Sequence, residues 1–227
     1  MIPEFCTDQP FDASVLGAPV WRLNDVGRTA DAVSAARAAG VGLMFYRGLS
    51  DRTSELEPHG FRRVETLVTF EGDLPAGPAP NHVRRATTGD ADAVASIAHS
   101  AFRTDRWHAD PLIPDDRADE FKAAWARNDI TGRADVVLLA CAADGAVAGF
   151  NAILLRGDVA AIDLIAVAPG HQGQGIGRAL IQGMGAFLPT ARSVRVGTQA
   201  ANVASLKLYA SFGWREVSRA DTWHWVP

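Results

Sequence analysis

The sequence predicts an α/β (α+β) fold in which helices flank a mixed β-sheet, and three observations support this prediction. Apolar runs of strand length alternate with amphipathic helical patterns from residue 15 to the end of the chain. An Asp-Gly pair at residues 144–145 separates two apolar runs, which is a strong signal for a β-hairpin. A cluster of glycines at residues 170–177 follows one apolar run and precedes a helical pattern.

The composition is that of a globular protein, with 227 residues of which 48% are hydrophobic and 21% charged. A formal net charge of −4 argues against binding to nucleic acid or to an anionic membrane surface. The two cysteines, Cys6 and Cys141, have neither the spacing of a disulfide framework nor that of a metal site. Without an 18-residue apolar run or a basic leader followed by an apolar stretch, the sequence predicts a cytoplasmic protein with no membrane span.

A change in composition predicts how the chain is divided. Residues 71–81, EGDLPAGPAPN, contain three prolines and two glycines, which cannot sustain a helix or a central strand. We therefore predict a small, partial α/β domain over residues 1–72, a linker over 73–81 and a larger domain over 82–227. The first unit is small for independent stability, so we expect it to pack on the second.

The elements of the first unit follow from their periodicity. An alanine-rich pattern that ends at Gly40 predicts a helix, and period-two alternation predicts a strand before the linker. The expected elements, in order, are a strand at 15–23, a helix at 28–40, a strand at 41–48, a short helix at 50–57 and a strand at 60–71.

In the second unit we expect one strand, then a pair of helices, then three consecutive strands, and finally alternating helices and strands. Asp90 is the expected N-cap of its first helix. The expected elements are strands at 82–87, 134–142, 145–157, 159–169, 193–199, 214–220 and 222–226, with helices at 88–102, 117–130, from about 175 to 188, and 202–213.

The segment APGHQGQGIGRAL, residues 168–180, is the most informative stretch, because it places four glycines and two glutamines between a strand and a helix. Backbone N–H groups at a helix N-terminus suit an anion, and glycines remove the Cβ atoms that would keep a phosphate away. The spacing excludes two common phosphate motifs, since there is no GK[ST] and the glycines at 173, 175 and 177 read GxGxG. The pattern that remains is Gln172-x-x-Gly175-x-Gly177; the alternative interpretation is a tight turn alone.

The residues around this loop favour an anion-binding site over a tight turn alone. IDLIAVAPGHQGQGIGRALI followed by NVASLKLYASFGWREV resembles the GNAT superfamily, the Gcn5-related N-acetyltransferases, over roughly residues 82–227. The resemblance implies a twisted, mostly antiparallel sheet, and acetyl-CoA as the acetyl donor without a metal. It also implies that the strand before the loop diverges from its neighbour. The residues implied to bind the donor are Ile165, Ala166, Val167, Gln172, Gly173, Gln174, Gly175, Ile176, Gly177, Arg178, Asn202 and Tyr209.

Two positions depart from the family pattern. Gln172 stands where the family often has arginine, which removes a charge-assisted contact, and Ser205 stands where alanine is usual. Asn202 has an alternative role as a helix N-cap.

The chemistry of amine acetylation requires a neutral amine, stabilisation of the thioester oxygen and protonation of the leaving thiolate. Tyr209 matches the family's general acid, with a merely buried helix tyrosine as the alternative. The backbone N–H of Val167 is the expected oxyanion donor. Asp163, Glu65 and His108 are the candidate bases, although Asp163 is equally compatible with a solvent-facing edge position.

The acceptor is a small-molecule amine in this interpretation. Chain length, linker position and the segment DRWHADP are similar to the dTDP-fucosamine acetyltransferase group, which implies a nucleotide-linked amino sugar and makes Arg103, Arg106, Trp107 and His108 candidate contacts, with Arg117. A solvated charged loop is the alternative for these residues. A polyamine, an aminoglycoside-like amine, a protein N-terminus and a non-catalytic acyl-CoA sensor remain open, as does a homodimer.

Overall fold

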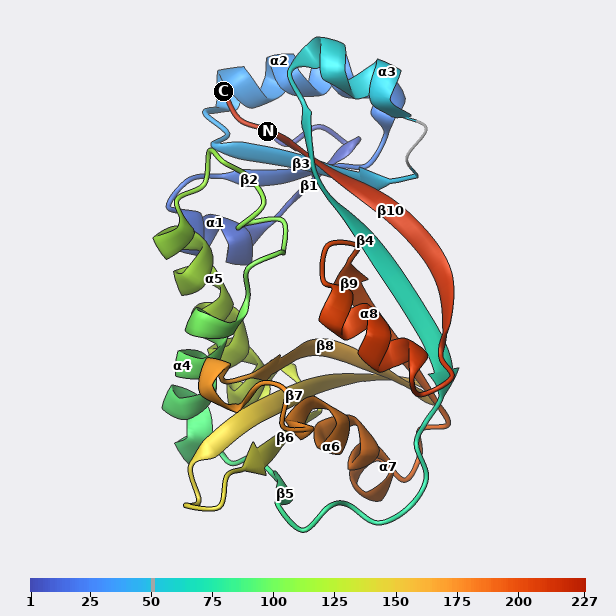
Figure 1. Cartoon of the computed structure of the whole chain (residues 1–227). Helices are drawn as coiled ribbons and strands as arrows, with labels where there is room; N and C mark the ends of the chain where they lie inside the picture. Colours follow the sequence, from blue (N-terminus) through green and yellow to red (C-terminus); the bar gives the residue numbers. More distant parts are fainter. Residues whose placement is uncertain (50–51) are drawn as a thin grey trace.

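The computed structural model describes residues 1–49 and 52–227. Their strands form one twisted ten-stranded sheet (Figure 1). The strand order is β1-β2-β3-β10-β4-β9-β8-β7-β6-β5, and only the β2–β3 and β8–β9 pairs are parallel. The predicted mixed, mostly antiparallel sheet is therefore confirmed. The strands are β1 (Cys6–Asp8), β2 (Val20–Leu23), β3 (Leu43–Gly48), β4 (Arg62–Asp73), β5 (Val83–Arg85), β6 (Val136–Cys141), β7 (Val147–Arg156), β8 (Val159–Val167), β9 (Ser193–Gln199) and β10 (Arg215–Trp225).

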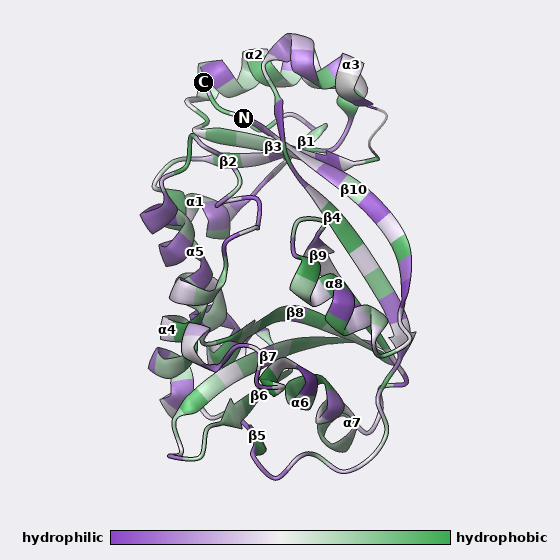
Figure 2. Cartoon of the chain, viewed as in Figure 1, coloured by the Kyte–Doolittle hydropathy of each residue, from purple (hydrophilic) through white to green (hydrophobic). Residues whose placement is uncertain are grey.

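Helices cover both faces of this sheet. They are α1 (Pro10–Leu16), α2 (Thr29–Ala39), α3 (Thr53–Leu56), α4 (Ala91–Ala101), α5 (Asp115–Asn128), α6 (Ile176–Gln182), α7 (Met184–Phe187) and α8 (Val203–Ala210). One core cluster packs α4 and α5 on β6–β8, and another packs α6–α8 on the opposite face. Both β7 and β8 are strongly hydrophobic (Figure 2), and β7 is buried on both faces, whereas β8 is buried on one face and half-buried on the other.

Two local predictions need correction. Residues 15–16 belong to α1 instead of a strand, because Pro10 suits the first helical turn and Gly17, at φ 74°, ends the helix. The two expected final strands form one strand, β10, whose register against β4 shifts twice. Asp90 occupies the N-cap position of α4 as expected, although its side chain caps the preceding 3-10 turn, in a capping box with Thr87. Part of the expected helix at 50–57 is α3, and residues 50 and 51 lie outside the described residues.

The sheet continues across the predicted linker. Strand β10, from the end of the chain, lies between β3 and β4, and β4 lies between β10 and β9. Figure 1 shows β4 and β10 running from the upper to the lower half of the molecule. The C-terminal strand thus joins the first 73 residues to the rest through backbone hydrogen bonds, and the division into two domains stays a prediction.

Gly72 on β4 packs directly beneath the buried Trp214. A Cβ at Gly72 would lie 2.1 Å from Cδ1 of Trp214, whose indole N–H donates to the Asp73 carbonyl oxygen at 3.0 Å. We expect Gly72→Ala to lower the free energy of unfolding by about 1–3 kcal/mol, measured by urea denaturation, because the indole must shift. Gly170→Ala is the control, since its Cβ would meet nothing within 4 Å. Equal unfolding midpoints for the two variants would contradict this account.

Candidate active site

The site is built around a gap between β8 and β9. Their parallel pairing runs from Val159 with Ser193 to Ile162 with Val196, and both strands continue beyond this point without pairing with each other. On its other side β8 stays paired with β7 as far as Val167. The Ala168 N–H points toward β7, donating to Ala148 at 2.9 Å. Because successive residues face alternate neighbours, the N–H groups of Ile165 and Val167 face the gap. The divergence that the family resemblance implied is present.

The glycine loop turns tightly from β8 into α6. Gly173 and Gly175 have φ values of 75° and 80°, which only glycine adopts without strain. The side chains of the two glutamines brace the loop: Gln172 Nε2 donates to the Val167 carbonyl at 3.3 Å and Gln174 Nε2 to the Gly170 carbonyl at 3.2 Å. These amides therefore hold the turn in shape. The N–H groups of His171 and Gln172 donate within the turn, whereas those of residues 173–178 donate to no backbone carbonyl in the described part of the chain and are left for a ligand.

A groove of about 710 Å³ lies along this loop, a size suited to a cofactor-like ligand. Its opposite wall is the end of α4 and the segment that follows, residues 100–104. We refer to it as the donor groove. Of the residues expected to bind the donor, Gln174 does not line it; those that do are Ile165, Ala166, Val167, Gln172, Gly173, Gly175, Ile176, Gly177, Arg178, Asn202 and Tyr209.

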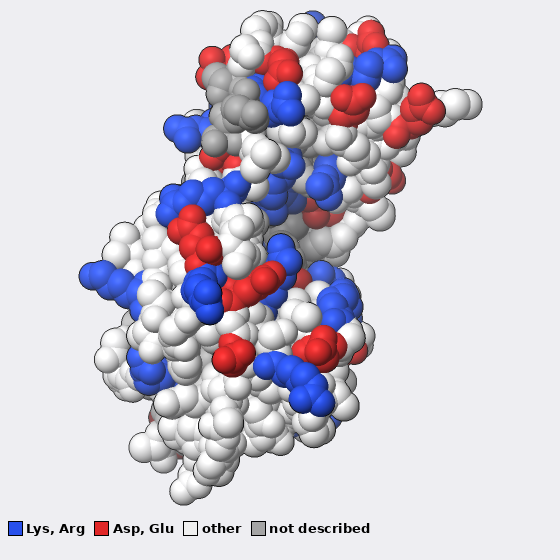
Figure 3. Space-filling model, turned by 90° about the vertical axis from the view of Figure 1, so that its right-hand side faces the viewer, with Lys and Arg blue, Asp and Glu red and all other residues white. Residues whose placement is uncertain are grey.

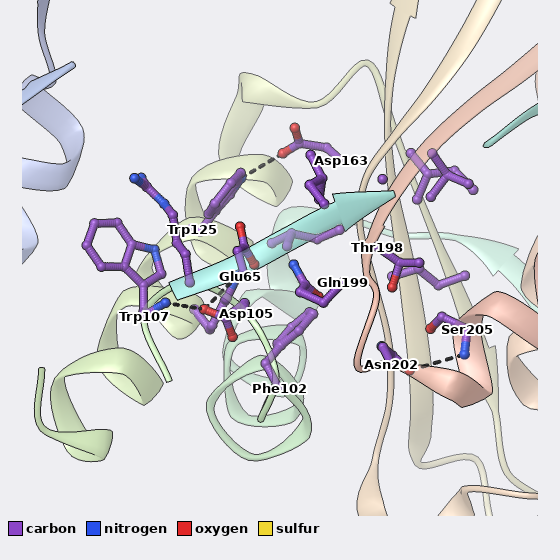
Figure 4. Close-up of a pocket in the computed structure, with 18 of the residues that line it drawn as sticks. Glu65, Phe102, Asp105, Trp107, Trp125, Asp163, Thr198, Gln199, Asn202 and Ser205 are labelled. Carbon is purple, nitrogen blue, oxygen red and sulfur yellow. Dashed lines mark hydrogen bonds and ion pairs between the residues drawn. The ribbon is translucent and has the colours of Figure 1, made fainter. Parts of the chain in front are cut away.

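A second cavity, of about 380 Å³, lies on the other side of the gap, and we refer to it as the acceptor cavity (Figure 4). Strands β2, β3 and β4 form one wall, while α5, β8 and β9 contribute the others. The donor groove and the acceptor cavity share five lining residues, namely Phe102, Ile165, Asn202, Ser205 and Tyr209. The two spaces therefore meet where β8 and β9 diverge.

Tyr209 stands at this junction. Its side chain, on α8, is 2% exposed and packs between Phe70 and Trp214, with ring centroids 5.8 Å away in each case. Burial raises the pKa of Tyr209 to about 12, although a hydrogen bond with Ser205 opposes the shift. The phenol therefore keeps its proton at neutral pH. Asn202 caps α8 by accepting the Ser205 N–H at 3.1 Å, so it serves as an N-cap and also lines both spaces.

Asp163 is the extra residue of a β-bulge in β8. Its carboxylate accepts the indole N–H of Trp125 at 2.6 Å and pairs with Arg133 through both oxygens. With a side chain 13% exposed, Asp163 is not a solvent-facing edge residue. Burial, followed by repulsion from Asp163, raises the pKa of the neighbouring Asp129 to about 7. Asp163 faces the acceptor cavity with its oxygens already engaged.

Glu65 lies on β4 and reaches the same cavity from the opposite wall. Its side chain is 3% exposed, and Oε1 accepts from Arg47 at 2.8 Å and from the Thr222 hydroxyl at 3.1 Å. Its other oxygen, Oε2, is buried and has no hydrogen-bond partner among residues 1–49 and 52–227. One carboxylate oxygen of Glu65 is thus available to a ligand.

The structure places the residues expected to contact the acceptor in different parts of the site. Arg106 and Trp107 line the acceptor cavity, whereas Arg103 lines the donor groove and pairs with Asp119 at 2.6 Å. His108 lines neither space; its ring contacts Asp105 at 2.6 Å and Asp119 at 3.1 Å. Burial opposes protonation, but these two carboxylates hold the pKa of His108 above its ordinary value, and they engage both ring nitrogens outside the cavity.

Sequence reasoning missed the part of the cavity wall that the first unit supplies. Arg22 on β2, with Phe45 and Arg47 on β3, lines the acceptor cavity. One signal in the sequence could have identified Arg47 as a site residue, because it is a charged residue at the end of a buried apolar strand. Within the described part of the chain, no group of three or more His, Cys, Asp or Glu residues is arranged to hold a metal, and no helix is long and apolar enough to cross a membrane.

Comparison with known families decides the membership of the chain. A family model described as "Acetyltransferase (GNAT) family" matches residues 99–214, more than half of the chain, and includes both the glycine loop and Tyr209. The chain belongs to the GNAT acetyltransferase family. The resemblance inferred from the loop and the downstream helix is confirmed.

The spore coat polysaccharide biosynthesis protein SpsD of Bacillus subtilis is 35% identical to this chain over 127 residues. The match covers 55% of this chain and 44% of SpsD, so it spans less than half the length of that protein.

Solved GNAT structures share the fold. A GCN5-related N-acetyltransferase from Sphaerobacter thermophilus has a TM-score of 0.61 at 20% identity, covering 91% of this chain and 72% of that one. Another from Kribbella flavida has a TM-score of 0.58 at 16% identity, with 91% and 80% covered. At these identities the likeness concerns the fold alone, and it extends over nearly the whole chain.

Proposed function

We propose that this chain transfers the acetyl group of acetyl-CoA to a primary amine of a small molecule by direct attack. The observation that carries the proposal is that the donor groove and the acceptor cavity meet at the gap between β8 and β9, with Tyr209 at the junction. A thioester in one space and an amine in the other come together there, so no nucleophilic serine or cysteine is needed.

The donor side of the proposal uses backbone groups. The N–H groups of the glycine loop bind the pyrophosphate of acetyl-CoA, because Gly173 and Gly175 carry no side chain that would block its approach. The gap-facing N–H and C=O groups of Ile165 bind the pantetheine arm. The N–H of Val167 stabilises the thioester oxygen as negative charge develops on it.

The transfer forms a bond between the amine nitrogen and the acetyl carbon and breaks the bond between that carbon and sulfur. Tyr209 donates its proton to the departing thiolate. A carboxylate accepts the proton that the amine gives up, and Glu65 is the better candidate of two. Its Oε2 has no partner in the described chain, whereas both oxygens of Asp163 are engaged by Trp125 or Arg133.

The acceptor in this proposal is a nucleotide-linked amino sugar. The support is the similarity to the dTDP-fucosamine acetyltransferase group and the match to SpsD, a protein named for polysaccharide biosynthesis. Trp107 lines the acceptor cavity but is 1% exposed and has the guanidinium of Arg106 over its ring at 4.0 Å, so in this proposal it positions that arginine.

The test follows the release of free CoA thiol from acetyl-CoA in the presence of amino-sugar nucleotides, polyamines or peptides. We expect amine-dependent release above the rate measured without amine, greatest for an amino-sugar nucleotide, with an acetylated product of matching mass. Turnover confined to polyamines or peptides would contradict the proposed acceptor class, and no amine-dependent release with any of them would contradict the transferase itself.

A further inference from the structure

Three guanidinium groups gather on the wall of the acceptor cavity that the first unit helps to build. Arg22 on β2 and Arg47 on β3 flank Phe45, and Arg22 is the register partner of Phe45 across the two strands. Arg106 lies over the Phe45 ring at 4.1 Å and over the Trp107 ring at 4.0 Å. In Figure 3, Lys and Arg side chains surround the hollow at the waist of the molecule. We refer to Arg22, Arg47 and Arg106 as the arginine wall.

The arginine wall has more positive than negative charge. Arg47 pairs with Glu65 at 2.8 Å and Arg106 with Asp12 at 2.6 Å. Arg22 is exposed and forms neither a hydrogen bond nor an ion pair with any residue of the described segments. The charges on the far wall compensate one another, since Lys122 lies 3.6 Å from Asp105 and Asp163 pairs with Arg133. The excess positive charge in the cavity therefore belongs to Arg22.

Arg106 also has an unused donor. Its Nη2 is bound by Asp12, while Nη1 is buried and meets no acceptor in residues 1–49 or 52–227. A buried charged donor without a partner is costly, and an anion in the cavity would remove that cost. Burial lowers the pKa of Arg106 to about 10, which leaves the guanidinium charged at neutral pH.

We infer that the acceptor amine carries an anionic group, a carboxylate or a phosphate, which binds the free donors of Arg22 and Arg106. A guanidinium can donate two parallel hydrogen bonds to two oxygens of either group. The inference rests on the proposed function for the place of the amine, at the junction beside Tyr209. Figure 4 shows Trp107 and Asn202 on opposite sides of the cavity, so the ligand spans it from the arginine wall to the junction.

Polycationic acceptors fit this wall poorly. A polyamine or an aminoglycoside-like amine would bring further positive charge against Arg22, and the two carboxylates beside the arginine wall, Glu65 and Asp12, already pair with Arg47 and Arg106. The arginine wall therefore selects among the acceptor classes that the sequence leaves open.

The test measures binding of matched amines by calorimetry, with CoA saturating the donor groove so that phosphate does not bind the glycine loop. Glucosamine 6-phosphate is compared with glucosamine, 4-aminobutyrate with its amide, and UDP-glucosamine provides the diphosphate arm. We expect the anionic member of a pair to bind about tenfold more tightly, and that preference to weaken with salt, because Arg22 is exposed. The anionic amine with the largest gain in affinity over its neutral counterpart identifies whether the group is a carboxylate or a phosphate.

The variant is Arg22→Gln, chosen because Arg22 makes no structural contact through its charge. We expect it to remove most of the preference for the anionic members and to leave the neutral amines unaffected. Arg215→Gln is the control, since Arg215 is an exposed arginine of β10 that lines neither space. Equal binding of charged and neutral members, an unchanged preference in Arg22→Gln, or no binding of any anionic amine would overturn the inference.

Binding without turnover keeps the two proposals apart. A preference for anionic amines that Arg22→Gln removes, in the absence of thiol release, would uphold the arginine wall and contradict acetyl transfer. Thiol release with no preference for anionic amines would uphold acetyl transfer and contradict the role of the arginine wall.

Discussion

Tyr209→Phe is expected to lower kcat for thiol release about 10²–10⁴-fold while leaving CoA affinity within about twofold. The substitution removes one hydroxyl and keeps the ring between Phe70 and Trp214, so packing is retained. Without that hydroxyl the thiolate leaves unprotonated. The measurements are kcat from thiol release and the Kd for CoA from calorimetry.

The chain supplies a matched control for this substitution. It contains two tyrosines, and the other, Tyr46 on β3, lines neither the donor groove nor the acceptor cavity. Tyr46→Phe should therefore turn over like the wild type. Equal kcat values for both variants would contradict the general-acid role, and a wild type without turnover that still binds CoA would favour a sensor.

The pH profile offers an independent check of the same role. Because burial raises the pKa of Tyr209 to about 12, the acid form is fully present below that value and is lost only as pH rises toward it. We expect kcat to show no loss attributable to this group between about pH 6 and 10. A fall in kcat through neutral pH must come from another group.

Glu65→Gln is expected to lower kcat/KM for the acceptor at least about 100-fold, with CoA affinity unchanged. The replacement keeps the shape of the side chain and an oxygen for Arg47 and Thr222, but removes the charge and the free carboxylate oxygen. Steady-state kinetics separate two roles, since kcat falls if Glu65 accepts the proton of the amine, and KM rises if it only holds the amine.

Two further variants test the assignment of Glu65 as the base. Glu71→Gln, on the same strand, is the control, because Glu71 is exposed enough to pair with Arg195 at the surface and lines neither space. Asp163→Asn tests the competing base. If Asp163→Asn abolishes turnover while Glu65→Gln keeps kcat/KM within twofold of the wild type, the assignment to Glu65 is wrong.

Most of the second unit was predictable because its signals are local. The Asp-Gly turn, the apolar runs of β6 to β8 and the strand at 193–199 are each encoded within a dozen residues. The first unit was harder, since the helix at residues 10–16 has too short a pattern to compete with the apolar run that follows it. The final strand was divided in two at Asp221, a charged residue that the sheet nevertheless buries, with its carboxylate accepting the Thr66 hydroxyl.

By itself, the sequence predicted the residues of the proposed donor site. The glycine spacing and Tyr209 lie within about forty residues of one another, where a loop and a helix follow directly from local backbone preferences. Only the tertiary structure decided the acceptor side. Arg22, Glu65 and Arg106 are far apart in the chain, and they meet because β10 pairs with both β3 and β4. Such long-range pairing leaves no periodic signal in any of the segments that it joins, so the residues that face the acceptor emerge only from the assembled sheet.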